Sequence, residues 1–131
     1  MSFAYWMIVV AMFLPYAAVV LAKSGGVDNH APRATLAALT GWRQRADWAQ
    51  RNHFEAFAPF AAAVIIAERA QVPQARIDIA AGAFIVLRIV YTGCYIADRA
   101  TLRSIAWSLA FLCVLALLVM SALPRSVTTI G

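Results

Sequence analysis

Charged residues are scarce in this 131-residue sequence, where Asp, Glu, Lys and Arg make up 13% and only six residues are acidic. Water-soluble domains carry about 25% charged and about 45–50% apolar residues. Here 63% of the residues are hydrophobic and the mean hydropathy is +0.75. The composition excludes a water-soluble globule and a disordered tail. It predicts a small integral membrane protein with a single domain over residues 1–131.

Cysteine and glycine are also rare, with two and six residues. These numbers exclude a disulfide-stapled secreted module and a collagen-like fibre. Cys94 and Cys113 both fall inside apolar segments, where a free thiol behaves as a small hydrophobic group. No Cys or His spacing is typical of a metal ligand set, so we expect no metal site.

The net charge of +5 reflects an uneven distribution of cations along the chain. Seven of the eleven cations lie in or beside the first and third connections between apolar segments: Lys23, Arg33, Arg43, Arg45, Arg51, Arg99 and Arg103. Arg69, Arg76 and Arg125 belong to the opposite side. Short cytoplasmic loops of membrane proteins carry such an excess. We therefore interpret the charge as topology, with the N-terminus outside, and not as a sign of nucleic-acid binding.

Four apolar segments predict an all-α, four-helix bundle. We expect helices over residues 3–22, 43–70, 76–98 and 102–123. Residues 3–22 span about 30 Å as a helix, the thickness of one hydrocarbon core. Residues 54–67 are too few to cross alone, so their helix must begin near Arg43, and Pro59 is expected to bend it. The long connection over residues 23–42 contains a short apolar stretch, residues 34–39, suited to the interface.

Arg88 lies near the centre of the third segment, where an arginine costs about 2.5–3.5 kcal/mol on insertion scales. It lies about 15 Å from the cytoplasmic end of its helix, and Glu55 lies about 18 Å from the cytoplasmic start of the preceding helix. Helices joined by a short turn are neighbours. The matching depths predict that Arg88 and Glu55 pair.

Each of these two residues has polar companions on its own helix face. Arg51 is about 40° and Asn52 about 60° from Glu55. On the third segment, Arg88, Tyr91 and Tyr95 lie within about 60° of one another. His53 is about 200° from Arg51, which predicts a headgroup-level or packing role for it. Such polar groups can simply tie helices together, but their number favours a binding or catalytic site.

The start of the fourth segment is a second candidate anion site. Thr101 is a plausible N-cap, which would place Arg103 and Ser104 in the first helical turn. A cation is disfavoured there by the helix dipole, while an anion is favoured. The alternative to a functional site at this position is a lipid phosphate at the membrane surface.

The motifs on the second and third segments resemble those of the MAPEG family, the membrane-associated proteins of eicosanoid and glutathione metabolism. The matching pieces are Arg51-Asn52-His53-Phe54-Glu55 with Pro59-Phe60, and Arg88-Ile89-Val90-Tyr91-Thr92-Gly93-Cys94-Tyr95. Arg103-Ser104 follows at a fitting distance. The resemblance extends over nearly the whole chain and is strongest to a small bacterial branch of the family. It therefore implies a multi-pass protein of the bacterial inner membrane.

The resemblance further implies a homotrimer that binds glutathione between subunits near the cytoplasmic side. The implied glutathione contacts are Arg51, Asn52, Glu55, Arg88, Tyr91 and Ser104. Arg103 is implied beside the sulfur with Tyr95 as a hydroxyl donor, and Lys23 matches a basic family position more loosely. Where many family members carry an arginine, this chain has Trp48, so one carboxylate contact is missing.

If glutathione binds, an arginine beside the sulfur would lower a thiol pKa that is ordinarily about 8.5. The thiolate would then attack a lipophilic electrophile or hydroperoxide, so we expect a transferase or peroxidase type of enzyme. One alternative is a non-catalytic bundle of the same fold that binds a lipid or a partner protein. Small multidrug transporters have a similar length, but they resemble one another in a first-helix Glu, and residues 3–22 contain no carboxylate.

Overall fold

The computed structural model of the protein describes residues 1–123, and over this range the chain forms only helices and their connections. The all-helical prediction is confirmed. The helices are α1 (Phe3–Lys23), α2 (Pro32–Ala37), α3 (Gly41–Arg69), α4 (Gln74–Ile96) and α5 (Ala100–Ala122). Arg125, which we placed on the side opposite to most cations, and Pro124, expected to follow the last helix, lie outside the described residues.

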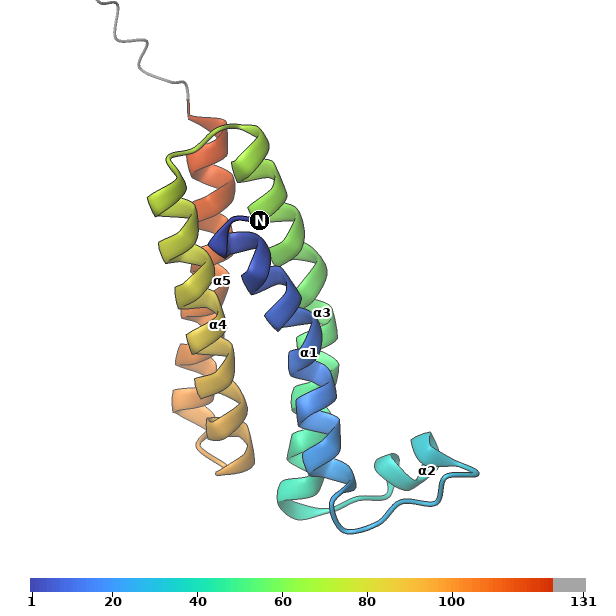
Figure 1. The fold of residues 1–131 in the computed structure, drawn as a ribbon. Coiled ribbons are helices and arrows are strands. Elements are labelled where there is room, and N and C mark those ends of the chain that lie inside the picture. Colours follow the sequence, from blue (N-terminus) through green and yellow to red (C-terminus); the bar gives the residue numbers. More distant parts are fainter. Residues whose placement is uncertain (124–131) are drawn as a thin grey trace, which may run out of the picture.

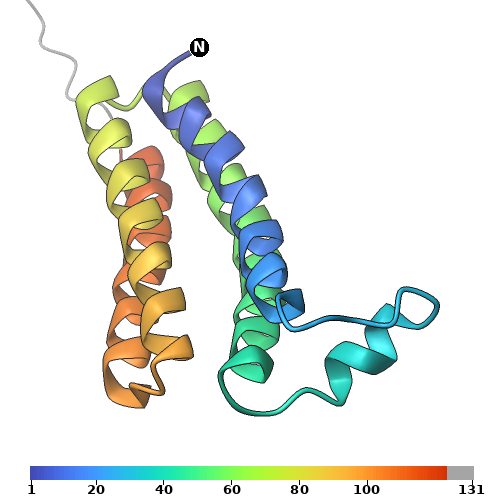
Figure 2. The ribbon, with the colours of Figure 1, turned by 60° about the horizontal axis from the view of Figure 1, so that its bottom comes forward.

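The four long helices are arranged as two antiparallel pairs. α1 lies beside α3, and α4 lies beside α5, in both views (Figures 1 and 2). The pairs approach each other at the end that holds the N-terminus and diverge toward the other end. The short helix α2 stands away from both pairs beside the start of α3 (Figure 1). The stretch expected to form an apolar turn over residues 34–39 thus overlaps α2.

Three of these helices are long and apolar enough to cross a membrane, namely α1, α4 and α5. Their mean hydropathies over 18 residues are 2.1, 1.8 and 2.4. α3 is longer, with 29 residues, but polar side chains occupy its first half and keep it outside this group. The finding supports a membrane protein, and the crossing of α3 stays a prediction.

Small residues make up the buried face of α1, the helix that packs beside α3. Every buried residue of α1 is small or a proline: Ala4, Ala11, Pro15, Ala18 and Ala22. The buried face of α3 carries four further alanines among larger residues. Lipid tails are as apolar as leucine, so helices in a membrane associate mainly through close packing, which small side chains allow.

A leucine at position 11 is expected to disrupt this contact. Ala11 is 4% exposed and belongs to the main hydrophobic core, so three added carbons have no space without moving a helix. We expect Ala11→Leu to destabilise the fold by about 1–3 kcal/mol, measured by thermal unfolding in detergent micelles. Ala17→Leu on the exposed side of α1 is the matched control. Equal melting temperatures for the two variants would contradict the close packing.

Arginines at the start of α3 bind the C-terminal ends of other helices. Arg43 donates from Nε to the carbonyl of Ala22 at 2.8 Å, and Arg45 donates from Nη2 to the carbonyl of Ile96 at 3.0 Å. The guanidinium of Arg43 lies against Gly25, where a Cβ would be 2.6 Å from Nη1 and would move the arginine. These contacts satisfy carbonyls that a helix end leaves free. They also bring the first and third connections, with their cations, to the same end of the molecule.

Candidate functional site

Arg88 is the largest fully buried side chain of the described residues, with 1% of its surface exposed. It lies on the buried face of α4, which continues in steps of three and four residues from Ile77 through Phe84 to Tyr91. Its guanidinium carbon lies 4.3 Å from the centre of the Tyr91 ring, close enough for a cation–π contact. Arg88 therefore faces the protein interior, in agreement with the cost of exposing an arginine to lipid.

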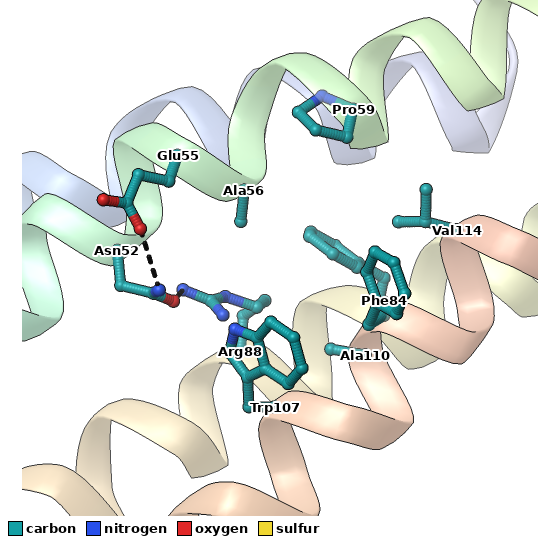
Figure 3. Close-up of a pocket in the computed structure, with 10 residues that line it drawn as sticks. Asn52, Glu55, Ala56, Pro59, Phe84, Arg88, Trp107, Ala110 and Val114 are labelled. Carbon is teal, nitrogen blue, oxygen red and sulfur yellow. Dashed lines mark hydrogen bonds between the residues drawn. The ribbon is translucent and has the colours of Figure 1, made fainter.

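The direct pair that we predicted between Arg88 and Glu55 is wrong. Arg88 Nη2 donates to Oδ1 of Asn52 at 2.8 Å, and Nδ2 of Asn52 donates to Oε2 of Glu55 at 3.2 Å (Figure 3). Asn52 thus links the two charged groups. The matching depth is right, but Glu55 lies on the exposed side of α3 while Arg88 points at the buried side. The depth of a residue along its helix does not determine toward which side of the helix its side chain points.

His53 has the packing role, not the headgroup-level position, of the two that we expected, and it packs against Arg88. The side chain is 3% exposed, and its Nδ1 accepts from Nη2 of Arg88 at 3.1 Å and from Nε at 3.4 Å. The buried face of α3 runs through Ala46, Ala49, His53 and Phe60 at three-, four- and seven-residue spacing. That spacing is the signal by which the sequence could have placed His53. The polar stripe of α3 is more conspicuous, but Ala49 and His53 on the buried stripe are the residues that meet α4.

A cavity of about 150 Å³ lies beside Arg88, between α3 and the α4–α5 pair. We call it the Arg88 cavity. Its lining residues are Asn52, Glu55, Ala56, Pro59, Phe84, Arg88, Trp107, Ala110, Phe111 and Val114 (Figure 3). Polar groups stand together around Asn52 and Arg88, and the rest of the lining is apolar. The cavity can therefore hold a guest with a polar or anionic end and a hydrophobic remainder.

A second space of about 260 Å³, the Arg103 cleft, lies between α4 and α5. Its lining residues are Tyr91, Tyr95, Arg103, Ser104, Trp107 and Ser108. Arg103 places its guanidinium carbon 4.6 Å from the centre of the Tyr95 ring, and the Tyr91 and Tyr95 ring centres are 5.5 Å apart. The structure thus brings four predicted site residues together: Tyr91, Tyr95, Arg103 and Ser104. Trp107, which the sequence interpretation missed, lines both this cleft and the Arg88 cavity.

The predicted N-cap of the last helix is wrong. α5 begins at Ala100, its N-cap is Arg99, and no side chain caps it. Thr101 therefore lies within the first turn, as does Arg103. The uncapped N–H groups and Arg103 both favour an anion at this end of α5.

Arg51 does not join the other predicted site residues within the single chain. Its Nη2 lies 2.9 Å from Oδ2 of Asp47 on the preceding turn, and its side chain is 60% exposed. It lines a separate cleft of about 370 Å³ beside α2, which we call the Arg33 cleft. The lining residues are Arg33, Leu36, Asp47, Gln50, Arg51 and Phe54. Within a single chain, Arg51 and Glu55 therefore line different spaces, and their joint role in one site stays a prediction.

Trp48, at the position where the family resemblance implies an arginine, packs beside the Arg103 cleft. Its ring centre is 6.2 Å from that of Tyr95. Lys23 is exposed at the last residue of α1. Trp48 therefore supports a site tyrosine by packing instead of supplying a charge.

The Arg88 cavity and the Arg103 cleft together are lined by one buried guanidinium, one half-buried guanidinium, two tyrosines and a set of apolar side chains. Arg88 is held by the neutral acceptors of Asn52 and His53, and the only ion pair among residues 1–123 is Arg51 with Asp47. A buried cation without a carboxylate partner is costly unless an anion or hydrogen-bond acceptors compensate it. The arrangement suits an anionic guest with several hydrogen-bonding groups.

A comparison with models of protein families matches residues 2–123 to one described as the MAPEG family. No curated protein and no solved structure matches the chain.

Proposed function

The chain belongs to the MAPEG family, and from that premise we propose that it binds glutathione in the membrane and activates its thiolate against lipophilic electrophiles. The family includes glutathione transferases and related proteins. The observation that carries the proposal is the buried Arg88 guanidinium, held by neutral acceptors and facing a cavity. Glutathione has two carboxylates, an amino group and amides, and so matches a site that combines cations, a carboxylate and hydroxyl groups.

In this proposal the polar ends of glutathione are held at the mouth of the Arg88 cavity. Arg88 attracts a carboxylate, while Glu55 accepts from the amino group and Asn52 hydrogen-bonds to either end. The Tyr91 hydroxyl and Ser104 are further donors at the Arg103 cleft. Because Trp107 lines both spaces, one extended peptide can reach from Asn52 to Arg103 without leaving the lined surface.

Arg103 is the proposed catalytic residue for thiolate formation. A positive charge beside a sulfur favours the charged thiolate over the neutral thiol, and an arginine stays protonated at any physiological pH. If the thiol pKa falls by about one or two, the few per cent of thiolate in free glutathione becomes a large fraction at neutral pH. Tyr95, which lies under Arg103, is placed to donate its hydroxyl to the sulfur or to the second substrate.

We further propose a homotrimer in which a neighbouring subunit completes the site. Arg51 lies 60% exposed in the Arg33 cleft, away from Arg88, and a guest at a subunit seam would bring the two faces together. The cations at one end of the molecule support a cytoplasmic position for this end. The electrophile would enter from the bilayer.

Calorimetric titration of the detergent-solubilised protein with glutathione tests the proposal directly. We expect saturable binding at micromolar to millimolar ligand, since the site offers several charge-assisted hydrogen bonds. The same titration with a glutathione ester, whose carboxylates are blocked, should show weaker binding. Absence of heat at millimolar glutathione would overturn the proposal.

A second candidate is a non-catalytic bundle that binds a lipid or a partner protein. Trp48 favours it, because this position carries no cation for a carboxylate of glutathione. Mass spectrometry of the intact complex in detergent, with and without glutathione, separates the two candidates and also counts the subunits. A retained phospholipid that glutathione does not displace would favour the second.

A further inference from the structure

His53 connects α3 to α4 through both nitrogens of its ring. Nδ1 lies 3.1 Å from Nη2 and 3.4 Å from Nε of Arg88, and Nε2 lies 2.7 Å from Oγ1 of Thr92. The hydroxyl of Thr92 in turn donates to the backbone carbonyl of Arg88 at 3.1 Å. Thr92 follows Arg88 by one helical turn, so one imidazole contacts two successive positions of the same face of α4.

The position of every hydrogen in this arrangement follows from what each group can donate. A guanidinium has only donors, so Nδ1 of His53 must be an unprotonated acceptor. An imidazole with one bare nitrogen carries its hydrogen on the other, so Nε2 is protonated and donates to Thr92 Oγ1. Since that hydroxyl uses its own hydrogen for the carbonyl of Arg88, its lone pair is free to accept. His53 is thus the neutral Nε2–H tautomer.

We propose that His53 is a positioning residue, which holds the guanidinium of Arg88 in the orientation that presents it to the Arg88 cavity. Asn52 and His53 together engage Nη2 and Nε, and neither contact involves Nη1. Every fully buried side-chain polar atom among the described residues has a hydrogen-bond partner, so Nη1, which has none, is not fully buried. Because these contacts leave out Nη1, its two hydrogens remain for a guest in the cavity that Arg88 lines.

The rigid ring explains why a histidine suits this position. An arginine side chain has many rotamers, and fixing it before a ligand arrives removes an entropic cost from binding. Thr92 holds the imidazole by accepting from Nε2, which keeps the bare nitrogen directed at Arg88. The role of the guanidinium toward glutathione rests on the proposed function, whereas the tautomer and the contacts of His53 do not.

The tautomer can be measured without any activity. The chain contains two histidines, His30 in the first connection and His53, so ¹⁵N-histidine labelling gives a spectrum of two imidazoles, and His30→Gln assigns them. In the full-length protein in lipid bilayers we expect His53 to show a protonated Nε2 and a bare Nδ1. Thr92→Val should keep Nδ1 bare, because Arg88 still offers it only donors, and should change the signal of Nε2 alone. A protonated Nδ1 at His53 in the unaltered protein would overturn the proposal.

Two substitutions of His53 separate its role as a hydrogen-bond acceptor for Arg88 from the mere volume of its ring. His53→Phe keeps the ring but has no acceptor, and we expect the KM for glutathione to rise about tenfold or more, with a smaller change in kcat. His53→Asn places an amide oxygen near the position of Nδ1 and should restore the KM to within a few-fold. If His53→Phe folds and binds glutathione as the unaltered protein does, the positioning role is refuted.

Failure of the proposed function has a different signature. An unaltered protein that shows the Nε2–H tautomer but no heat on titration with glutathione would refute glutathione as the guest, while the arrangement around Arg88 would stand.

Discussion

Replacement of Arg103 by alanine is expected to abolish the ultraviolet absorbance of bound thiolate that glutathione should produce with the unaltered protein. Arg103 lines the cleft with Tyr95 and lies at the N-terminal turn of α5, so it is the cation nearest to the proposed place of the sulfur. Without this charge the thiol pKa returns toward its ordinary value, and the thiolate fraction at neutral pH should fall about tenfold or more. The turnover of an electrophile should fall by a similar factor.

Arg99→Ala is the matched control for this variant, because Arg99 is exposed one turn away and lines none of the three described spaces. It should leave the absorbance unchanged. Arg103→Lys keeps the charge but loses the planar guanidinium over the Tyr95 ring, and an intermediate signal is expected. An Arg103→Ala protein that binds glutathione with full thiolate absorbance would remove Arg103 from the mechanism.

Replacement of Arg88 by alanine is expected to damage both the fold and the binding of glutathione. The change would leave the acceptors of Asn52 and His53 without donors, remove the contact with the Tyr91 ring and enlarge the cavity. Unsatisfied buried groups cost about 1–3 kcal/mol each. We expect a loss of about 3–5 kcal/mol of unfolding free energy, seen as a lower melting temperature in detergent, and at least a tenfold loss of glutathione affinity.

Arg76→Ala provides the control on the same helix, since Arg76 is exposed near the opposite end of α4 and should change stability by less than about 0.5 kcal/mol. Arg88→Lys distinguishes charge from geometry, because lysine carries the charge without the fork that engages Asn52 and His53 together. Equal stability of the Arg88→Ala and Arg76→Ala proteins would show that the buried contacts contribute nothing.

The helices and the membrane environment were largely predictable from residue order. A long apolar run can be assigned as a membrane helix without knowing its neighbours. The helix makes its own backbone hydrogen bonds, and the thickness of the bilayer sets its length. The ends of the helices were less predictable. α4 ends at Ile96 and α5 begins at Ala100, so Thr101 does not have its expected capping role. Helix ends depend on a few local hydrogen bonds of similar energy.

The candidate site was likewise predictable only in part. The expense of a charge in lipid indicated that Arg88 must be buried, and this holds. The identity of its partner did not follow from depth, because Asn52 and His53 are adjacent in sequence but differ in direction by about 100°. Arg51 shares a predicted face with Glu55, yet it turns toward Asp47 because a carboxylate one turn away is the nearer partner.

Residue order alone therefore indicated that this chain belongs in a membrane, that Arg88 must be buried, and which family motifs it carries. Only the tertiary structure decided which side chains come together. The imidazole of His53 contacts Arg88, Trp107 lines both the Arg88 cavity and the Arg103 cleft, and Arg51 lines neither of them. The physical reason is that helical periodicity determines height and direction only relative to the helix's own axis. The rotation of one helix against its neighbour depends on packing small residues such as Ala49 and Ala63 at close range.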